Sequence, residues 1–122
     1  MSYTFVDTCI LIDVLKGKFK LDTKNKVINS IVEMELLQGV RDKRELKIVQ
    51  NFLNSFQRVE INQDILNYAK DLIETYSLSH NLKLADAIIG STAIVYNIPL
   101  LTHNTKDFRF LPYLELADLE EI

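Results

Sequence analysis

Cysteine, glycine and proline are all scarce in this sequence. Cys9 is the single cysteine, so the chain can form neither an intramolecular disulfide nor a zinc site built from several cysteines. Only 3 Gly and 2 Pro occur in 122 residues, which argues against long disordered linkers. No apolar run is long enough to span a bilayer, and the first residues lack the basic and apolar regions of a signal peptide. We therefore expect a cytoplasmic protein with no membrane partner.

Positive charge is limited as well. The sequence has 14 Lys and Arg against 17 Asp and Glu, a formal net charge of −3. This balance argues against a protein that holds nucleic acid by bulk charge alone, but a nuclease is compatible, because carboxylates that hold metal ions add negative charge. Five lysines lie between residues 16 and 26 with one acid, Asp22. A solvated loop is the first interpretation of that segment, and a phosphate-contacting surface is the alternative.

The length and composition suit one domain over residues 1–122 with one core. Short β-branched and aromatic segments alternate with segments of helical periodicity. Strands are predicted at residues 3–6, 27–29, 58–61, 100–102 and 114–116, and helices at residues 9–15, 30–38, 44–56, 65–76 and 84–96. This alternation predicts an α/β fold with a central parallel sheet of about five strands and right-handed crossovers. The last of these helices is apolar nearly all round and should be well buried.

Polar residues mark the ends of two predicted helices. Ser30 and Glu33 have the spacing of a capping box, and Gly39 is a suitable left-handed terminator for the same helix. Asp7 ends the first strand and either it or Thr8 can cap the first helix. Ligands of open α/β sheets bind at the carboxyl ends of strands, so Asp7 is either a cap alone or a site residue.

Four carboxylates are the candidate site residues, and each has a structural alternative. Asp7 ends a strand and can act as a cap. Glu35 is flanked by apolar residues that crowd it, although it can also lie on an exposed stripe. Asp86 lies near the start of the most apolar helix, whose positive end favours a carboxylate. Asp107 follows the strand at residues 100–102, and it can cap the turn that starts at Phe108.

In a doubly wound topology the ends of the first and fourth strands face the same crevice, so these carboxylates are expected to converge. A carboxylate cluster without clustered Cys or His is a hard-oxygen site, which suits Mg²⁺ or Mn²⁺ rather than Zn²⁺. Such ions activate water and stabilise charge on a phosphoryl group, so phosphodiester hydrolysis is the natural chemistry. Thr8, Thr102 and Asn104 are candidate supporting residues that could orient a water or a phosphate.

The sequence resembles the PIN domain family, and within it the VapC-type ribonuclease toxins of prokaryotic toxin–antitoxin pairs. Four motifs in family-like order carry the resemblance: Phe5-Val6-Asp7-Thr8 with Ile10-Leu11-Ile12-Asp13; Ser30 with Glu35-Leu36-Leu37 and Gly39; Leu84-Ala85-Asp86-Ala87-Ile88-Ile89; and Leu101-Thr102-His103-Asn104-Thr105-Lys106-Asp107-Phe108. The resemblance implies a three-layer α/β sandwich and a Mg²⁺- or Mn²⁺-dependent endoribonuclease. It also implies an RNA substrate, a cognate antitoxin and a homodimer.

The resemblance assigns roles position by position. Asp7, Glu35 and Asp86 match the three metal-site acids of the family, and Asp107 matches a fourth, more variable one. Thr8 matches a hydroxyl residue beside the first acid.

Two further positions match the family less closely. Cys9 stands where relatives often carry Asn or Ser, which puts a polar role for that position in doubt. Asp13 is interpreted as structural, and His103 as a loop residue outside the site.

Other functions are compatible with the same residues. A PIN fold that binds RNA or a partner without cutting is the main alternative, and metal-stimulated cleavage would decide against it. A phospho-acceptor receiver domain would need adjacent acids after the first strand, where only Asp7 occurs. A DNA nuclease would use the same carboxylates.

Overall fold

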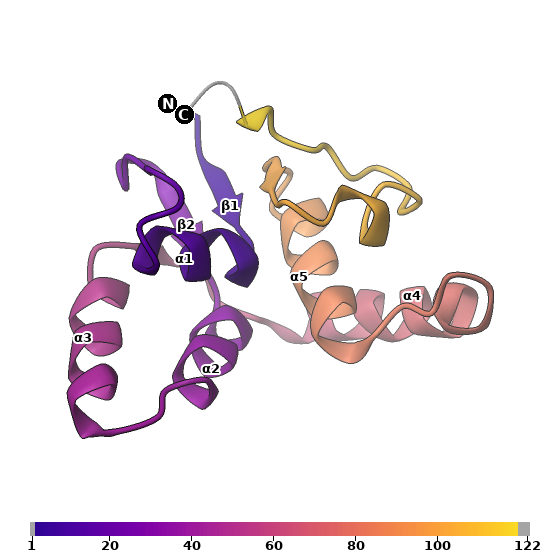
Figure 1. The fold of residues 1–122 in the computed structure, drawn as a ribbon. Helices are drawn as coiled ribbons and strands as arrows, with labels where there is room; N and C mark the ends of the chain where they lie inside the picture. Colours follow the sequence, from indigo (N-terminus) through magenta and orange to yellow (C-terminus); the bar gives the residue numbers. More distant parts are fainter. Residues whose placement is uncertain (1, 120–122) are drawn as a thin grey trace.

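The structure, a computed structural model, describes residues 2–119. Strands and helices alternate along the chain (Figure 1). In order they are β1 (Thr4–Val6), α1 (Thr8–Leu15), β2 (Lys26–Ile28), α2 (Ser30–Gln38), α3 (Lys43–Leu53), β3 (Gln57–Arg58), α4 (Gln63–His80), α5 (Leu84–Val95), β4 (Leu100–Leu101) and the 3₁₀ helix η1 (Thr105–Asp107). No helix between residues 2 and 119 is long and apolar enough to cross a membrane.

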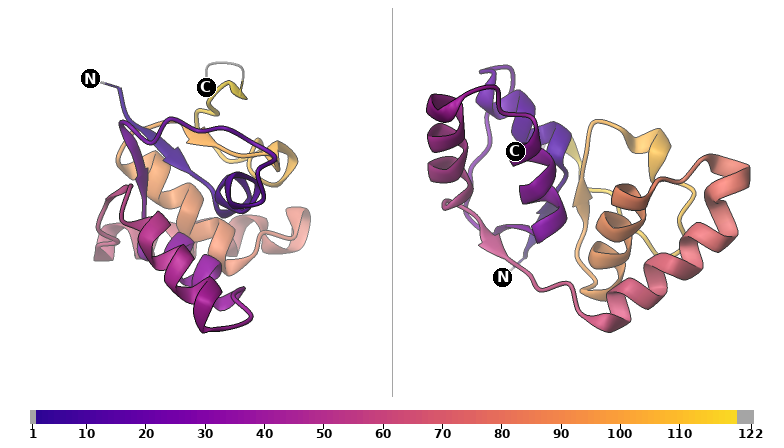
Figure 2. Two further views of the ribbon diagram at one scale, coloured as in Figure 1. Left: turned by 60° about the vertical axis from the view of Figure 1, so that its left-hand side comes forward. Right: turned by 90° about the horizontal axis from the view of Figure 1, so that it is seen from below.

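The sheet has the strand order β3-β2-β1-β4, and every pair is parallel. The chain moves outward from β1 to β3 and then returns across the sheet to β4. Because crossovers between parallel strands are right-handed, this reversal places α1 to α3 on one face and α4 and α5 on the other (Figures 1 and 2). The predicted α/β sandwich with a parallel sheet is therefore confirmed.

The sheet has four strands rather than the predicted five or so. In the predicted fifth strand, only Leu116 forms a parallel bridge, to Leu100. Two backbone hydrogen bonds hold it, from Leu100 N to Glu115 O at 2.9 Å and from Ala117 N to Leu100 O at 2.8 Å. Since β4 itself spans only two residues, the pairing does not extend into a full strand.

The core lies on both faces of the central strands. Phe5 and Val6 of β1 are fully buried, as are Leu100 and Leu101 of β4, as expected for strands covered by helices on both sides. The middle of α5 is buried too, whereas its first residue, Leu84, is 67% exposed. The burial predicted for this helix is thus confirmed for its central turns and wrong at both ends, since Val95 is 43% exposed as well.

The segment after η1 packs closely on α5 at Gly90. A Cβ atom at that position would lie 2.6 Å from Leu111 Cδ1, so a side chain there would push Leu111 away. Both Leu111 and Phe108 are buried. This contact holds η1 against the helix that carries Asp86.

Asn29, rather than Ser30, caps α2. Its Oδ1 accepts a hydrogen bond from Val32 N at 3.1 Å, and its Nδ2 donates to Thr92 Oγ1 of α5 at 3.0 Å. The predicted capping box is therefore wrong by one residue, since Ser30 is already helical and Glu33 pairs with Arg58 instead. Gly39 has φ −84°, so the left-handed terminator predicted there is also wrong.

Loss of the Asn29 side chain should reveal its double role. In Asn29→Ala both the cap and the bond to α5 are lost, and we expect the free energy of unfolding to fall by about 2–3 kcal/mol. Asn62 is the matched control, because its Oδ1 caps α4 by accepting from Ile65 N at 2.9 Å on an exposed surface. Asn62→Ala should cost about 1 kcal/mol in the same urea titration. Equal losses would show that the bond to Thr92 adds nothing.

Candidate active site

Asp7 and Thr102 follow neighbouring strands and touch. β1 and β4 are paired, and Asp7 N donates to Leu101 O at 3.0 Å. Thr102 Oγ1 donates to Asp7 Oδ2 at 2.8 Å. The crossovers from these two strands go to opposite faces of the sheet, which is the topological switch point where open α/β sheets bind ligands. The chain thus places a buried carboxylate where a ligand site is expected.

Asp7 is held on both carboxylate oxygens. Its Oδ1 accepts from Thr8 N at 2.8 Å, which caps α1, and its Oδ2 accepts from the Thr102 hydroxyl and from Cys9 Sγ at 3.4 Å. Only 5% of the residue is exposed. Capping and a site role therefore do not compete, since one oxygen caps the helix while the other faces the switch point.

Glu35 reaches the same region from α2. Thr8 Oγ1 donates to Glu35 Oε1 at 2.7 Å, which links the amino end of α1 to the middle of α2. Glu35 itself is exposed, so the expectation that apolar neighbours crowd it is wrong. The reason is the buried stripe of α2, which consists of Val32 and Leu36 and leaves Met34 54% exposed.

The pKa of Asp86 is affected by the other three candidate carboxylates. Its pKa is raised to about 7, chiefly by burial and further by the charges of Asp7, Asp107 and Glu35. Asp86 lies in the first turn of α5, where the helix end favours an ionised carboxylate. That benefit is outweighed, since the net pKa shift is upward. Carboxylates from four segments of the chain are thus close enough for the other three to affect the ionisation of Asp86.

Asn104 precedes the short helix η1, and Asp107 belongs to it. Asp107 is exposed and is the last residue of η1, so the predicted cap of a turn at Phe108 is wrong. Asn104 joins the site through its backbone, because Asn104 N donates to Thr102 Oγ1 at 3.0 Å. The Thr102 hydroxyl therefore connects this loop to Asp7.

The donor set fits a hard divalent cation by its chemistry. Within residues 2–119, no Lys, Arg or His forms an ion pair with any of the four carboxylates. A buried carboxylate without a cation is costly, and a divalent ion with oxygen ligands would offset that cost. Across the same residues, however, no three His, Cys, Asp or Glu side chains are arranged as a ready-made metal site. Side chains such as Glu35 would have to turn toward the ion.

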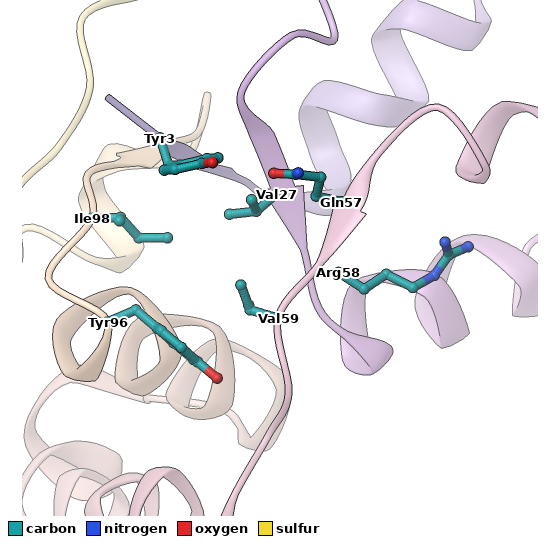
Figure 3. A pocket seen from close by; sticks show the side chains of 7 residues that line it. All are labelled: Tyr3, Val27, Gln57, Arg58, Val59, Tyr96 and Ile98. Atoms are coloured by element: carbon teal, nitrogen blue, oxygen red, sulfur yellow. The ribbon is translucent and has the colours of Figure 1, made fainter. Parts of the chain in front are cut away.

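Two hollows lie away from Asp7. A groove of about 590 Å³ runs between α1, α2 and α3, and its lining includes Glu35 together with apolar side chains such as Ile12 and Ile48. A second hollow of about 520 Å³ lies among Tyr3, Tyr96 and Ile98 (Figure 3). Since Tyr3 and Ile98 precede β1 and β4, this hollow reaches the amino ends of the strands, opposite the carboxylates.

Two features of the site were missed from the sequence. Cys9 Sγ lies 3.4 Å from Asp7 Oδ2 and 3.4 Å from Thr102 Oγ1, so this position does have a polar role. Burial and the charge of Asp7 raise the pKa of the thiol, which keeps its proton available for donation. His103 Nε2 lies 2.9 Å from Asp13 Oδ2. Cys9 lies 93 residues from Thr102, and Asp13 lies 90 residues from His103, so sequence spacing gives no signal for these two contacts.

Comparison with known proteins identifies the family of this chain. The sequence profile described as PIN domain matches residues 4–111. The chain belongs to the PIN domain family. This PIN domain is 33% identical to Ribonuclease VapC of Rickettsia bellii, over 91% of this chain and 92% of the relative. The relationship therefore places the chain among the VapC proteins.

Solved structures show the same fold. A toxin–antitoxin complex from Klebsiella pneumoniae contains a chain 31% identical to this PIN domain, with a TM-score of 0.75 and coverage of 99% of this chain and 100% of that one. A chain of DNA-bound VapBC from Salmonella typhimurium gives a TM-score of 0.85 at 21% identity, covering 98% and 99%. The second likeness supports the fold alone.

Proposed function

We propose that this PIN domain is a Mg²⁺- or Mn²⁺-dependent endoribonuclease and the toxin of a toxin–antitoxin pair. The observation that carries the proposal is the position of Asp7, which is only 5% exposed at the carboxyl end of β1 and accepts hydrogen bonds from Thr102 and Cys9, beside the Thr8 hydroxyl that binds Glu35. The pKa of Asp86, raised chiefly by burial and further by the charges of Asp7, Asp107 and Glu35, supports it. Carboxylate oxygens are the ligands that a hard cation prefers, and such cations serve phosphodiester hydrolysis. The relative from Rickettsia bellii carries the name Ribonuclease VapC, which supports RNA as the substrate.

In this proposal Asp7, Glu35 and Asp86 would hold the cation, with Asp107 completing the set. When bound, a divalent cation lowers the pKa of a water molecule and stabilises charge on a phosphoryl group. The hydroxyl of Thr102 and the thiol of Cys9 fix the orientation of Asp7 Oδ2. The hydroxyl of Thr8 restrains Glu35. These neutral donors orient ligands without adding positive charge that would compete with the ion.

Cleavage of total RNA by the purified protein tests the proposal. We expect cleavage in the presence of Mg²⁺ or Mn²⁺ and its loss on addition of a chelator, and mapping of the cut ends should show internal breaks. A second addition of Mg²⁺ in excess of the chelator should restore cleavage. Cutting that continues at full rate in the chelator would contradict the metal dependence.

A PIN-fold module that binds RNA or a partner without cutting is the alternative. The absence of a ready-made three-ligand group among residues 2–119 favours it. The same assay separates the two functions, since a binding module would retain RNA in a shift assay and leave it intact at every metal concentration.

The proposed partners are an antitoxin protein and a second copy of the chain. The structural relative from Klebsiella pneumoniae was solved as a toxin–antitoxin complex, which supports a protein partner. Co-purification with the product of a neighbouring reading frame would test this, and failure of every such product to bind would contradict it.

A solution mass of twice 14.1 kDa would support the homodimer, and a mass of 14.1 kDa would oppose it. The cytoplasmic location stays a prediction.

A further inference from the structure

The loop between α1 and β2 is the most basic part of the chain. Residues 16–25, here called the lysine loop, contain four lysines and one acid. All four lysines are exposed, and none of them forms an ion pair within residues 2–119. Figure 1 shows the loop leaving the end of α1 and running back to β2. The exposed lysines are therefore free to contact either solvent or an anionic ligand.

Phe19 attaches this loop to the candidate active site. Its ring meets the ring of His103 edge to face, with centroids 5.3 Å apart and an interplanar angle of 85°. Lys18 and Lys20 are the chain neighbours of Phe19, so the contact fixes the backbone that carries them. Lys18 N also donates to Asp13 O at 2.8 Å, after a turn in which Gly17 has φ +74°. The loop is therefore held at its start and at its aromatic residue.

His103 is in turn fixed to the carboxylate cluster. It follows Thr102 directly, and its backbone N–H donates to Cys9 Sγ at 3.4 Å. Its Nε2 lies 2.9 Å from Asp13 Oδ2, which sets the orientation of the ring. A continuous series of contacts thus runs from Phe19 through His103 and Cys9 to Asp7. This series holds the backbone of Lys18 and Lys20, the neighbours of Phe19, on the side of the molecule that carries Asp7.

A cluster of carboxylates repels the phosphates of RNA unless positive groups hold the strand beside it. We propose that the lysine loop, anchored by Phe19 on His103, binds the phosphate backbone of single-stranded RNA next to the carboxylate cluster. This inference rests on the proposed function and names the surface that receives its substrate. Lys18 and Lys20 contact phosphates, and His103 is the positioning residue that holds the loop in place.

The binding of a fluorescein-labelled oligouridylate tests this inference. The measurement uses the Asp7→Asn background, in which the probe stays intact, and follows fluorescence anisotropy over a range of salt concentrations. The double variant Lys18→Ala/Lys20→Ala should bind at least about tenfold more weakly, and its salt slope should fall by about 1.4, since each phosphate contact to a single strand contributes about 0.7. The control Lys47→Ala/Lys70→Ala removes the same charge from α3 and α4, and should change neither value.

A pair of substitutions at His103 tests the anchor. His103→Ala removes the ring that Phe19 meets and should weaken binding with both lysines present. His103→Phe keeps a ring at this place and should restore most of the affinity. If both variants lose binding equally, the anchoring role is overturned.

The result is separable from the proposed function. If the wild-type protein cleaves total RNA but the lysine pair can be removed without effect on affinity or salt slope, the surface is wrong and the nuclease stands. If the lysine pair matters but no RNA is cut at any metal concentration, the surface stands and the nuclease is wrong. If the Asp7→Asn protein with both lysines present does not bind the oligouridylate, the inference is overturned directly.

Discussion

Asp7→Asn should reduce the rate of RNA cleavage by about 100-fold or more. The substitution removes one charge from the proposed metal ligand at the switch point, and removal of a stabilising group of this kind costs several kcal/mol in the transition state. The fold should survive, because Asn has the same shape and its Oδ1 can still accept from Thr8 N. The Thr102 hydroxyl can accept from the new amide in place of donating to a carboxylate.

The measurement is a time course of total-RNA cleavage, with the melting temperature taken on the same preparation. Asp71→Asn is the matched control, since it removes an equal charge from an exposed position on α4. Its cleavage rate should equal that of the wild type within about twofold. An Asp7→Asn protein that melts normally and cuts at the wild-type rate would show that Asp7 acts only as a helix cap.

Asp86→Asn should abolish cleavage and at the same time stabilise the metal-free protein. The pKa of Asp86 is about 7 in the folded state, against an ordinary value of 3.8, because of burial and the charges of Asp7, Asp107 and Glu35. Between roughly pH 4 and pH 7 the folded protein keeps a proton that the unfolded chain has released. Stability therefore falls as pH rises through this window, and the loss is complete above pH 7. Asn cannot ionise, so the variant escapes it.

Thermal melts in chelator across pH 4 to pH 8 check this prediction. The difference in melting temperature, variant minus wild type, should be near zero at pH 4, grow to a few degrees by pH 7 and then level off. Asp71→Asn should follow the wild-type curve throughout. A difference that is negative at pH 8 would mean that Asp86 is stabilised by a partner in the folded state. Retention of cleavage by Asp86→Asn would remove it from the site.

The sequence was informative where local chemistry decides structure. The residues from Thr4 to Val6 favour a β-strand, and Asp7 follows them directly. Asp7 ends this strand and caps the next helix, as the sequence indicated. The order of the first four strands and the five α-helices followed from periodicity and from the β-branched and aromatic residues, whereas the predicted fifth strand is reduced to a single bridge. Asp86 was identifiable because a carboxylate stands out in an apolar helix, and its placement in the first turn of α5 agrees with that prediction.

Features set by tertiary contacts could not be read in this way. Ser30 has a better local capping pattern than Asn29, but Asn29 also bonds to Thr92, which lies 63 residues away. Glu35 is exposed because the rotation of α2 is set by what Val32 and Leu36 pack against. The contact between His103 and Phe19 depends on the path of a loop, and no spacing encodes that path.

Titration with Mn²⁺ by calorimetry at pH 7 tests the central claim most directly, namely that the carboxylates of four segments share one cation. The wild-type protein should show saturable binding with release of protons, because Asp86 must lose its proton to become a ligand. Asp7→Asn should bind at least about 100-fold more weakly, and Asp71→Asn as tightly as the wild type. Equal affinity in wild type and Asp7→Asn, or no saturable binding by the wild type, would contradict the account.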